Sequence, residues 1–335
     1  MPDLSHLSLL VPEWEDLFHI RYNILCATIQ KPGIGRRQLS RNLNQTERRI
    51  RTEIDLLVRL DLLESTPKGL NLTQLGNQVM YRLEGFSQTR SEHGELENYL
   101  TKKLGIRRVL IGQTLDEVAE LGHRQLGGFL ESVRTLGITG GASVKSLIDR
   151  VVPFDHPDLT IVPARGSLGE STAVQANTLA EELASRLNAH FYPLITIDHL
   201  QQATREQMLQ EPVIKRTLRR IERIDGLVFG IGRAEDMMER RNLSSRLRRE
   251  LKAAGAVGEA LGTFFNLAGE RVYELETFGV PLEHVTTLDN LLAIAYGVEK
   301  AQAIIAVSHI NSNIILVTDA SCAREMFTIL GGING

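Results

Sequence analysis

Four segments of the chain combine glycine with hydroxyl or basic side chains, and this combination suits the binding of an anion. The segments are Thr139–Ser143, Val162–Glu170, Gly230–Arg233 with Arg240–Asn242 behind it, and Tyr296–Lys300. Glycine allows backbone amides to approach an anion closely, and the start of a helix adds positive potential. Three of the segments also have a cation nearby, which can pair with a phosphate or a carboxylate. Each segment alone could be an ordinary turn, but together they favour one anionic ligand.

The candidate ligand-binding groups are the hydroxyls, backbone amides and long polar side chains of these segments. Lysine and arginine would neutralise the charge of the anion, and the other groups would donate hydrogen bonds to it. The set comprises Thr139, Gly140, Gly141, Ser143, Arg165, Gly166, Gln175, Arg241 and Lys300.

Signals for other chemistries are missing. No G-x-G-x-x-G fingerprint of a dinucleotide site follows the first expected strand of the larger domain, and there is no G-x-x-x-x-G-K-[ST] phosphate loop. The histidines, and the two cysteines Cys26 and Cys322, have no metal-ligand or redox spacing. We therefore expect no cofactor and no metal. Because no apolar run approaches the roughly 18 residues of a membrane span, and no basic residues precede the apolar N-terminal patch, we expect a cytoplasmic protein without membrane contact.

A second group of reactive side chains lies near the N-terminus, where arginines cluster. Between residues 33 and 60 the chain carries seven arginines against three acidic residues, although its overall formal charge is −3. A local basic patch of this kind attracts a phosphate backbone.

The apolar spacing around this patch predicts three helices. The first runs from Trp14 to Ile29, a short one covers 35–43, and the third covers 47–63 with Asn44 or Thr46 as its N-cap. Helix, short helix, turn and basic helix is the order of a helix-turn-helix motif.

A hairpin is predicted directly after the third helix, from Leu63–Thr66 and Gly69–Thr73 on either side of Pro67-Lys68. It would form the wing of a winged helix-turn-helix. In such motifs the start of the third helix enters the major groove, where arginine can donate two hydrogen bonds to guanine. The candidate DNA-binding residues are Arg48, Arg49 and Arg51 near bases or phosphates, Thr46 at the start of the same helix, and Arg36, Arg37 and Lys68 at phosphates.

Beyond Leu104, short apolar runs alternate with amphipathic stretches, which is typical of a parallel sheet wrapped by helices. The predicted strands are Arg108–Gly112, Thr135–Thr139, Leu159–Pro163, Phe191–Ile195, Gly226–Gly230, Leu291–Ala295, Ala303–Val307 and Ile314–Val317. Ligands of open α/β sheets bind beyond the carboxyl ends of the strands, where the four glycine-bearing segments would lie.

The predicted fold is therefore α/β, with a winged helix-turn-helix followed by a Rossmann-like parallel-sheet domain. A polar stretch at 87–95 predicts a linker, so we expect a DNA-binding domain with a linker helix over 1–88 and an effector-binding and oligomerisation domain over 89–335. The helices on either side of the linker could dimerise or pack on their own domains. A homodimer or homotetramer is expected, because paired DNA-binding heads match paired half-sites.

The sequence resembles the SorC/DeoR-type sugar-binding transcription regulators, and within them those that control central glycolytic genes in Gram-positive bacteria. The similarity covers nearly the whole chain. Its most specific element is VPARGSLGE followed by QANTLAEELA, and it extends to IGRRQLSRNL, ERRIRTEIDLL, TGG, GIGRAEDMMERRN, EALGTFFNLAGE and LVTDASCARE.

The resemblance implies a sensor domain related to sugar-phosphate isomerases and deaminases, and a repressor that a phosphorylated sugar such as fructose 1,6-bisphosphate releases from operator DNA. The ligand positions that it implies are Thr139, Gly140, Gly141, Arg165, Gln175, Arg241 and Lys300. The chain departs from the family pattern at Ala142, where a hydroxyl residue is usual, and at Ala268, where an aspartate is usual. These changes would remove a phosphate donor and a contact to sugar hydroxyls.

Two alternatives remain. The larger domain could be a sugar-phosphate isomerase or deaminase, but such chemistry needs a positioned general base, and the glycine-bearing segments supply cations and amides instead. We therefore expect no catalytic residues and no enzyme. The domain could also serve only for oligomerisation, in which case no sugar phosphate would bind it.

Overall fold

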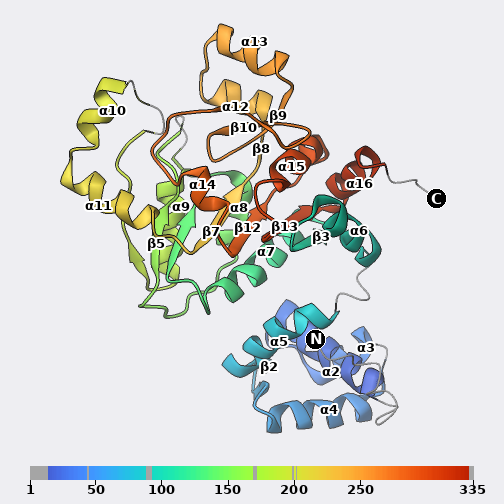
Figure 1. Ribbon diagram of the computed structural model, residues 1–335. Coiled ribbons are helices and arrows are strands. Elements are labelled where there is room, and N and C mark those ends of the chain that lie inside the picture. Colours follow the sequence, from blue (N-terminus) through green and yellow to red (C-terminus); the bar gives the residue numbers. More distant parts are fainter. Residues whose placement is uncertain are drawn as a thin grey trace. The chain divides into compact units, whose positions relative to one another are not determined.

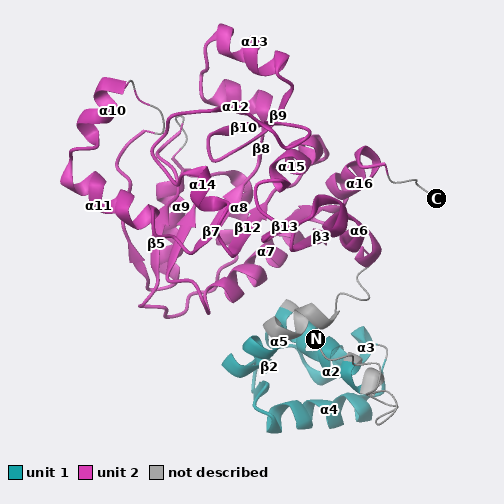
Figure 2. Cartoon of the chain, viewed as in Figure 1, with its two compact units in different colours: residues 1–91 teal, residues 92–335 magenta. Residues whose placement is uncertain are grey.

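The computed structural model describes residues 14–43, 45–87, 93–168, 172–197, 200 and 202–331. The chain divides into two compact units, residues 1–91 and 92–335 (Figure 1, Figure 2). Some expectations fall outside the described residues: those on the N-terminal residues 1–13, on Asn44 as a cap, on the linker at 88–92 and on Gly169–Glu170.

Unit 1 is a helical fold with one hairpin. Its elements are α2 (Trp14–Gln30), α3 (Arg36–Asn42), α4 (Glu47–Arg59), the antiparallel strands β1 (Leu63–Thr66) and β2 (Gly69–Leu72), and α5 (Gln74–Ser87). Apolar side chains that recur along one face of each helix form the core, and they include Ile24, Leu39, Ile50, Ile54 and Leu57. The predicted winged helix-turn-helix order is confirmed.

The hairpin is fastened to the turn before α3 by a close backbone contact. Ile34 and Leu70 form an antiparallel bridge, and the amide of Gly33 donates to the Leu70 carbonyl over 2.9 Å. A Cβ atom on Gly69 would lie 2.0 Å from the Gly33 oxygen, and Gly69 has a φ of +118°. Only glycine fits there. The wing therefore has a fixed place beside α3.

Unit 2 is built on a seven-stranded parallel sheet of order β3-β13-β12-β7-β4-β5-β6. The strands are β3 (Arg108–Gly112), β4 (Thr135–Ile138), β5 (Thr160–Pro163), β6 (His190–Phe191), β7 (Gly226–Gly230), β12 (Asn290–Ile294) and β13 (Ile314–Asp319). Both faces are apolar, since Val228 of β7 enters one core cluster while Leu227 and Phe229 enter another. Such double burial is usual for parallel sheets.

Helices cover the two faces of this sheet (Figure 1). One face carries α7 (Leu115–Phe129), α8 (Ala142–Ile148) and α9 (Ala176–Arg186). The other carries α6 (Gly94–Leu104), α11 (Pro212–Ile221), α14 (Leu282–Val285), α15 (Ala301–Ser308) and α16 (Ala320–Ile329). The short α10 (Gln202–Met208) precedes α11. Within the part of the chain that the structure describes, no helix has the length and apolar character to cross a membrane.

A second, antiparallel sheet of order β11-β10-β9-β8 was not predicted from the sequence. Its strands are β8 (Gly232–Arg233), β9 (Ala256–Ala260), β10 (Thr263–Asn266) and β11 (Arg271–Glu274), and two helices, α12 (Ala234–Arg240) and α13 (Ser245–Ala253), connect β8 to β9. The strands are short, and β11 is mostly exposed. They therefore lack the long apolar runs that reveal central strands.

Two predicted strands were wrong in type or extent. Ala303–Val307 lies within α15, whose residues 303–308 are all buried. A helix that is apolar all round gives the same signal as a buried strand when it is short. The strand expected at Phe191–Ile195 is reduced to β6, His190–Phe191. Asn177 pairs instead with the backbone of Leu194, through bonds of 2.9 Å to both its amide and its carbonyl.

Candidate functional site

The sheet topology of unit 2 places the four glycine-bearing segments along one edge. They follow β12, β7, β4 and β5, which are neighbours in the sheet, and the carboxyl ends of parallel strands share an edge. The direction of winding reverses between β4 and β7, because β4 leads outward to β5 and β6 while β7 leads outward to β12 and β13. A crevice at such a reversal is the usual ligand site of an open α/β sheet.

Thr139 joins the segments on the two sides of this reversal. Its Oγ1 accepts a hydrogen bond from the Gly230 amide over 3.1 Å. The Gly141 amide donates to the Val174 carbonyl over 2.8 Å, and a Cβ atom on Gly140 would lie 2.6 Å from the same oxygen. The structure therefore brings Thr139, Gly140 and Gly141 together with the residue that precedes Gln175.

Gly141 and Gln175 are the N-cap residues of α8 and α9, so two helices begin beside each other at this edge. Ser143 lies in the first turn of α8 and is buried. Ala142 is the exposed first residue of that helix. The hydroxyl that the family pattern would place at 142 is therefore missing from the candidate site itself.

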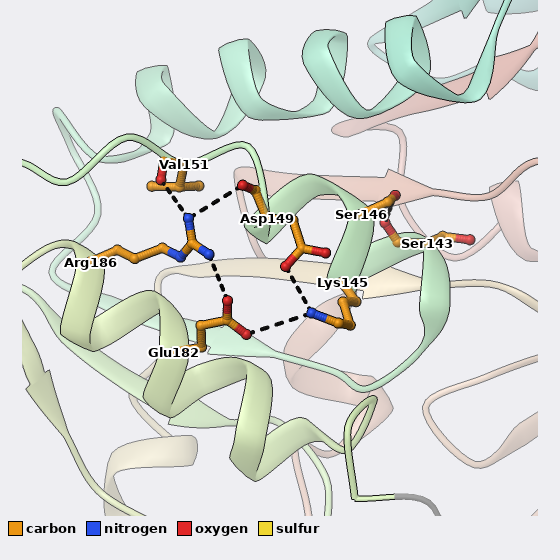
Figure 3. A network of polar contacts seen from close by, with 7 residues as sticks. All are labelled: Ser143, Lys145, Ser146, Asp149, Val151, Glu182 and Arg186. Atoms are coloured by element: carbon orange, nitrogen blue, oxygen red, sulfur yellow. Dashed lines mark hydrogen bonds and ion pairs between the residues drawn. The ribbon is translucent and has the colours of Figure 1, made fainter.

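A network of polar contacts holds α8 and α9 together (Figure 3). Arg186 donates to Glu182 over 2.7 Å and to the carbonyls of Asp149 and Val151 over 3.3 and 3.0 Å. Lys145 bonds to Asp149 over 2.8 Å and lies 3.9 Å from Glu182. Because the two helices are tied by these side chains and by the Gly141 amide, the loops at their N-termini keep a fixed spacing.

Arg165 is buried, with 6% of its surface exposed. Its backbone pairs with Gly279, and the following Gly166 amide donates to the Phe278 carbonyl over 2.9 Å. A Cβ atom on Gly262 would lie 2.5 Å from Nη2 of Arg165, and one on Gly279 would lie 2.7 Å from its Cδ. Two glycines thus leave room for the side chain and fix its direction.

Arg241 lies in a buried ion pair. Its Nη2 is 2.8 Å from Oε1 of Glu259, and the two side chains are 7% and 5% exposed. The same oxygen accepts a hydrogen bond from the Gly262 amide over 2.6 Å. Arg165 and Arg241 are therefore brought together across Gly262. Glu259 was not predicted from the sequence, although it stands in the EALG stretch that supported the resemblance.

Lys300 precedes α15, at the end of the short 3-10 helix η3 (Val298–Lys300). The pKa of its amino group is lowered, mainly because the group is buried. The nearby charge of Arg240 lowers the pKa further, and the carboxylates of Glu299 and Asp236 partly offset this by raising it. Arg240 was not among the predicted ligands. It is exposed and acts electrostatically on Lys300, so it belongs to the same positively charged region.

Ala268 lies away from Lys300, and the expectation that it removes a contact to the sugar stays a prediction. It is at the tip of the β10–β11 hairpin, where Asn266 Oδ1 accepts from the Ala268 amide over 3.1 Å. The tip packs on His309, because a Cβ atom on Gly269 would lie 2.4 Å from the His309 ring. His309 follows the last residue of α15 and Lys300 precedes the first, so about 12 Å of helix separates the tip from Lys300.

In unit 1 the predicted DNA-binding arginines form an exposed surface. Arg36, Arg37, Arg48 and Arg51 are exposed. Three of these arginines have acidic neighbours at long range: Arg36 and Arg51 lie 3.8 and 4.0 Å from Asp55, and Arg37 lies 4.0 Å from Glu47. Exposed pairs of this length contribute little to stability, so the arginines can exchange them for phosphates.

Thr46 and the wing complete this surface. Thr46 is the N-cap of α4, and its hydroxyl accepts from the Arg49 amide over 3.3 Å, which confirms its predicted capping role. The Arg49 side chain donates to Gln45 over 3.3 Å. Lys68 is exposed between β1 and β2, at the tip of the wing. The inner side of α4 holds Glu53, which is buried and accepts from Nε of Arg21 over 2.6 Å. That bond links the inner side of α4 to α2.

Among the described residues, no group of three or more histidine, cysteine, aspartate or glutamate side chains is placed to hold a metal ion. The arrangement in unit 2 is instead a set of backbone amides, hydroxyls and cations at the carboxyl edge of the sheet.

Known families match both units. A model of the Sugar-bind family, a sugar-binding domain, matches residues 89–328, and a model of the CggR N-terminal DNA binding domain matches residues 17–87. The chain is 32% identical to the central glycolytic genes regulator of Priestia megaterium over 327 residues, which cover 95% of this chain and 96% of that protein. The protein of the same name from Bacillus subtilis is 28% identical over 326 residues, with the same coverage.

Solved structures show the same architecture. A SorC family transcriptional regulator from Enterococcus faecalis matches with a TM-score of 0.65 and 27% identity, over 70% of this chain and 99% of its own. The full-length sorbitol operon regulator SorC from Klebsiella pneumoniae matches with a TM-score of 0.64 and 18% identity, over 94% of this chain and 99% of its own. At that identity the second match supports the fold alone.

Proposed function

The chain belongs to the SorC-type family of sugar-binding transcription regulators, and from this we propose that unit 1 binds operator DNA and that a phosphorylated sugar bound to unit 2 releases it. The resemblance drawn from the sequence is thereby confirmed at the level of the family. The relatives named as regulators of central glycolytic genes support the same target genes here. We infer that the protein acts as a repressor in the cytoplasm, as a homodimer or homotetramer.

The observation that carries the proposal is the convergence of four loops on the reversal point of the sheet. Thr139, Gly140, Gly141 and Gln175 lie at the start of two helices, where amides and hydroxyls can bind one phosphate. Arg165 and Arg241 meet across Gly262, and Lys300 stands on the loop after β12. A ligand with two phosphates would use these separate positive regions at once, so fructose 1,6-bisphosphate fits this arrangement better than a monophosphate.

The surface that supports operator binding is the outer side of α3, α4 and the wing. Arg48, Arg49 and Arg51 stand on the first turns of α4, which is the part of a recognition helix that contacts bases. Arg36, Arg37 and Lys68 flank it and would contact phosphates. These assignments follow from exposure and position along the helices.

Catalysis has less support, even though the structure adds a carboxylate that was not predicted from the sequence. Glu259 Oε1 already accepts hydrogen bonds from Arg241 and from the Gly262 amide. A general base must reach a proton of the substrate, whereas this oxygen holds two protein groups in place. We expect no isomerisation or deamination of fructose or glucosamine phosphates by the purified protein. Turnover that scales with protein concentration would contradict this.

The test is a thermal-shift screen of the purified full chain against a panel of glycolytic sugar phosphates. A ligand that binds only the folded state stabilises it by about 2.7 kcal/mol at one hundred times its Kd. We expect fructose 1,6-bisphosphate to raise the melting temperature of the wild type and to have little effect on Arg165→Ala.

The matched control is Arg223→Ala. Arg223 is also an arginine of unit 2, but it is exposed and precedes β7, at the opposite edge of the sheet from the candidate site. It should keep the full ligand response. A flat response of the wild type to the whole panel would contradict the sugar-phosphate proposal and favour a domain that only oligomerises.

A further inference from the structure

The loop that carries Lys300 is hydrogen-bonded to the first turn of α16. Oδ1 of Asp319 accepts from the Gly297 amide over 2.7 Å, and Oδ2 accepts from the Ser321 and Cys322 amides over 3.1 and 3.3 Å. Asp319 is therefore the N-cap of α16 and, with its other oxygen, the anchor of the loop before η3. One carboxylate holds both segments.

The conformation of this loop depends on that anchor. Gly297 has a φ of +102°, and a Cβ atom there would lie 2.4 Å from the Glu299 carboxylate. Lys300 comes three residues later, at the end of η3, which lies against α16. A ligand that draws the Lys300 amino group toward its phosphate would therefore pull on the N-terminus of α16.

The far end of α16 packs on α6. The rings of Phe327 and Tyr99 have centroids 4.6 Å apart, and the Tyr99 hydroxyl donates to the Leu330 carbonyl over 3.3 Å. Figure 1 shows the two helices side by side. Met326 of α16 and Leu100 of α6 share the same core cluster. Contacts therefore run from the Lys300 loop to the start of α16 and from the far end of α16 to α6.

The other attachment of α6 is to the edge strand β3. Thr101 Oγ1 accepts from the Val109 amide and Glu97 Oε1 accepts from the Ile111 amide, both over 2.9 Å. On its outer edge, where β3 has no neighbouring strand among the described residues, its backbone amides therefore donate to side chains of α6. A shift of α16 would therefore reach both α6 and the edge strand to which it is bonded. In chain order, α6 is the first helix of unit 2 after unit 1.

We propose that Asp319 is a positioning residue that holds the Lys300 loop on α16, and that α16 passes ligand binding to α6 through the Phe327–Tyr99 contact. The proposal rests on the proposed function, in which a sugar phosphate binds beside Lys300. It adds that ligand binding and operator release are separable, because the contact that transmits the signal does not touch the ligand.

The experiment measures two affinities of the full chain, with fructose 1,6-bisphosphate as the probe and an operator selected by the wild-type protein from random DNA. The first is the Kd for the sugar alone, and the second is the Kd for the operator without and with saturating sugar. In the wild type we expect the sugar to weaken operator binding about tenfold or more, which is within the usual range of coupling between two sites.

For Phe327→Ala we expect a sugar Kd and a sugar-free operator Kd within about threefold of the wild type, but a loss of most of the tenfold response. Tyr192→Ala is the control, because Tyr192 is a half-buried aromatic residue of the same unit that lies just after β6, at the opposite edge of the sheet. It should keep the response. If Phe327→Ala does not fold, Tyr99→Phe removes only the hydroxyl bond to Leu330 and should weaken the response partially.

For Asp319→Ala we expect weaker sugar binding and no operator response at saturation. Asp319→Asn should give an intermediate loss, because its single amide oxygen can cap α16 or accept from the Gly297 amide but cannot do both. A folded Phe327→Ala or Tyr99→Phe protein that keeps the full wild-type response overturns the proposed route alone. A wild-type protein that binds the operator but shows no response to the sugar overturns the proposed function, and the route with it.

Discussion

The candidate sites of the two units hold their arginines in opposite ways. In unit 1 the side chains of Arg36, Arg37 and Arg51 are 45, 83 and 71% exposed, and their carboxylate partners lie 3.8–4.0 Å away. In unit 2 the side chain of Arg241 is 7% exposed and lies 2.8 Å from Glu259, and Arg165 is buried between two glycines. The candidate surface of unit 1 has exposed charge in long ion pairs, whereas the candidate site of unit 2 has buried charge in a fixed geometry.

This difference matches the two kinds of ligand. Exposed cations bind a phosphate backbone at many positions, release its counterions and respond strongly to salt. Cations that are already desolvated and oriented lose little on binding, but they fit only a ligand of matching shape. A regulator needs the first property for DNA and the second for its effector. Substitutions in unit 1 should therefore change DNA binding, and substitutions in unit 2 should change effector binding.

Arg165→Ala should have the largest effect. If Arg165 contacts a phosphate as proposed, truncating this buried, oriented cation should weaken sugar-phosphate binding about 100-fold or more, equivalent to about 3 kcal/mol. Operator binding without sugar should be unchanged. Isothermal titration calorimetry and fluorescence anisotropy measure the two affinities. A parallel loss of both would show that Arg165 maintains the fold instead of binding the ligand.

Arg48→Ala combined with Arg51→Ala should weaken operator binding about tenfold at physiological salt, and should reduce the slope of log affinity against log salt by about 0.9 for each phosphate that the protein no longer neutralises. Sugar binding should not change. The measurement is a salt series of anisotropy titrations. An unchanged salt slope together with a weaker sequence preference would assign the two arginines to bases instead of phosphates.

Gly262→Ala should weaken sugar binding by a smaller factor than Arg165→Ala does. The new methyl group would meet Nη2 of Arg165 at 2.5 Å and would strain a residue whose φ is +84°. Arg165 should therefore shift while keeping its charge. Gly105→Ala is the control, because Gly105 also has a positive φ, +65°, but has open space around its Cβ position. Equal sugar affinities in the two variants would argue against a fixed Arg165 geometry.

Sugar-phosphate affinity should fall as the pH rises through the pKa of Lys300, which burial places below that of an ordinary lysine. The charged form binds phosphate, so the affinity is complete below this pKa and decreases above it. Lys300→Arg should remove the alkaline decrease, because arginine stays charged. An identical alkaline decrease in Lys300→Arg would assign it to another group.

Thr46→Ala should have the smallest effect, a loss of about 1 kcal/mol in the stability of unit 1, because the N-cap bond to Arg49 is removed. Chemical denaturation followed by circular dichroism measures it. A change of operator affinity larger than this loss would indicate that the Thr46 hydroxyl contacts DNA directly.

The sequence was sufficient for the winged helix-turn-helix and for most of the parallel sheet, because both give strong periodic signals. Leu39 and Ile50 mark the buried faces of α3 and α4, and the continuous apolar runs mark β3, β7 and β13. The antiparallel sheet was missed because β8 has only two residues and β11 is mostly exposed. The apolar run of α15 has the pattern of a strand because residues 303–308 of this helix are all buried.

The sequence indicated candidate residues for the site but not how those residues pair with one another. The types and spacing of Thr139, Arg165 and Lys300 indicated an anion site. The ion pair of Arg241 with Glu259 joins residues 18 positions apart through a sheet that the sequence did not reveal. The position of Ala268 was not predictable for the same reason, because it depends on the β10–β11 hairpin, whose tip lies near the C-terminal end of α15. Long-range pairings depend on tertiary structure, and a single sequence does not specify them.

The most direct test of the central claim is one anisotropy titration of the wild-type protein on its selected operator, with and without fructose 1,6-bisphosphate, and with unphosphorylated fructose as the comparison. We predict that the bisphosphate weakens operator binding about tenfold or more and that fructose does not. Operator binding that is unchanged by a bisphosphate that demonstrably binds unit 2 would contradict the proposed coupling of the two units.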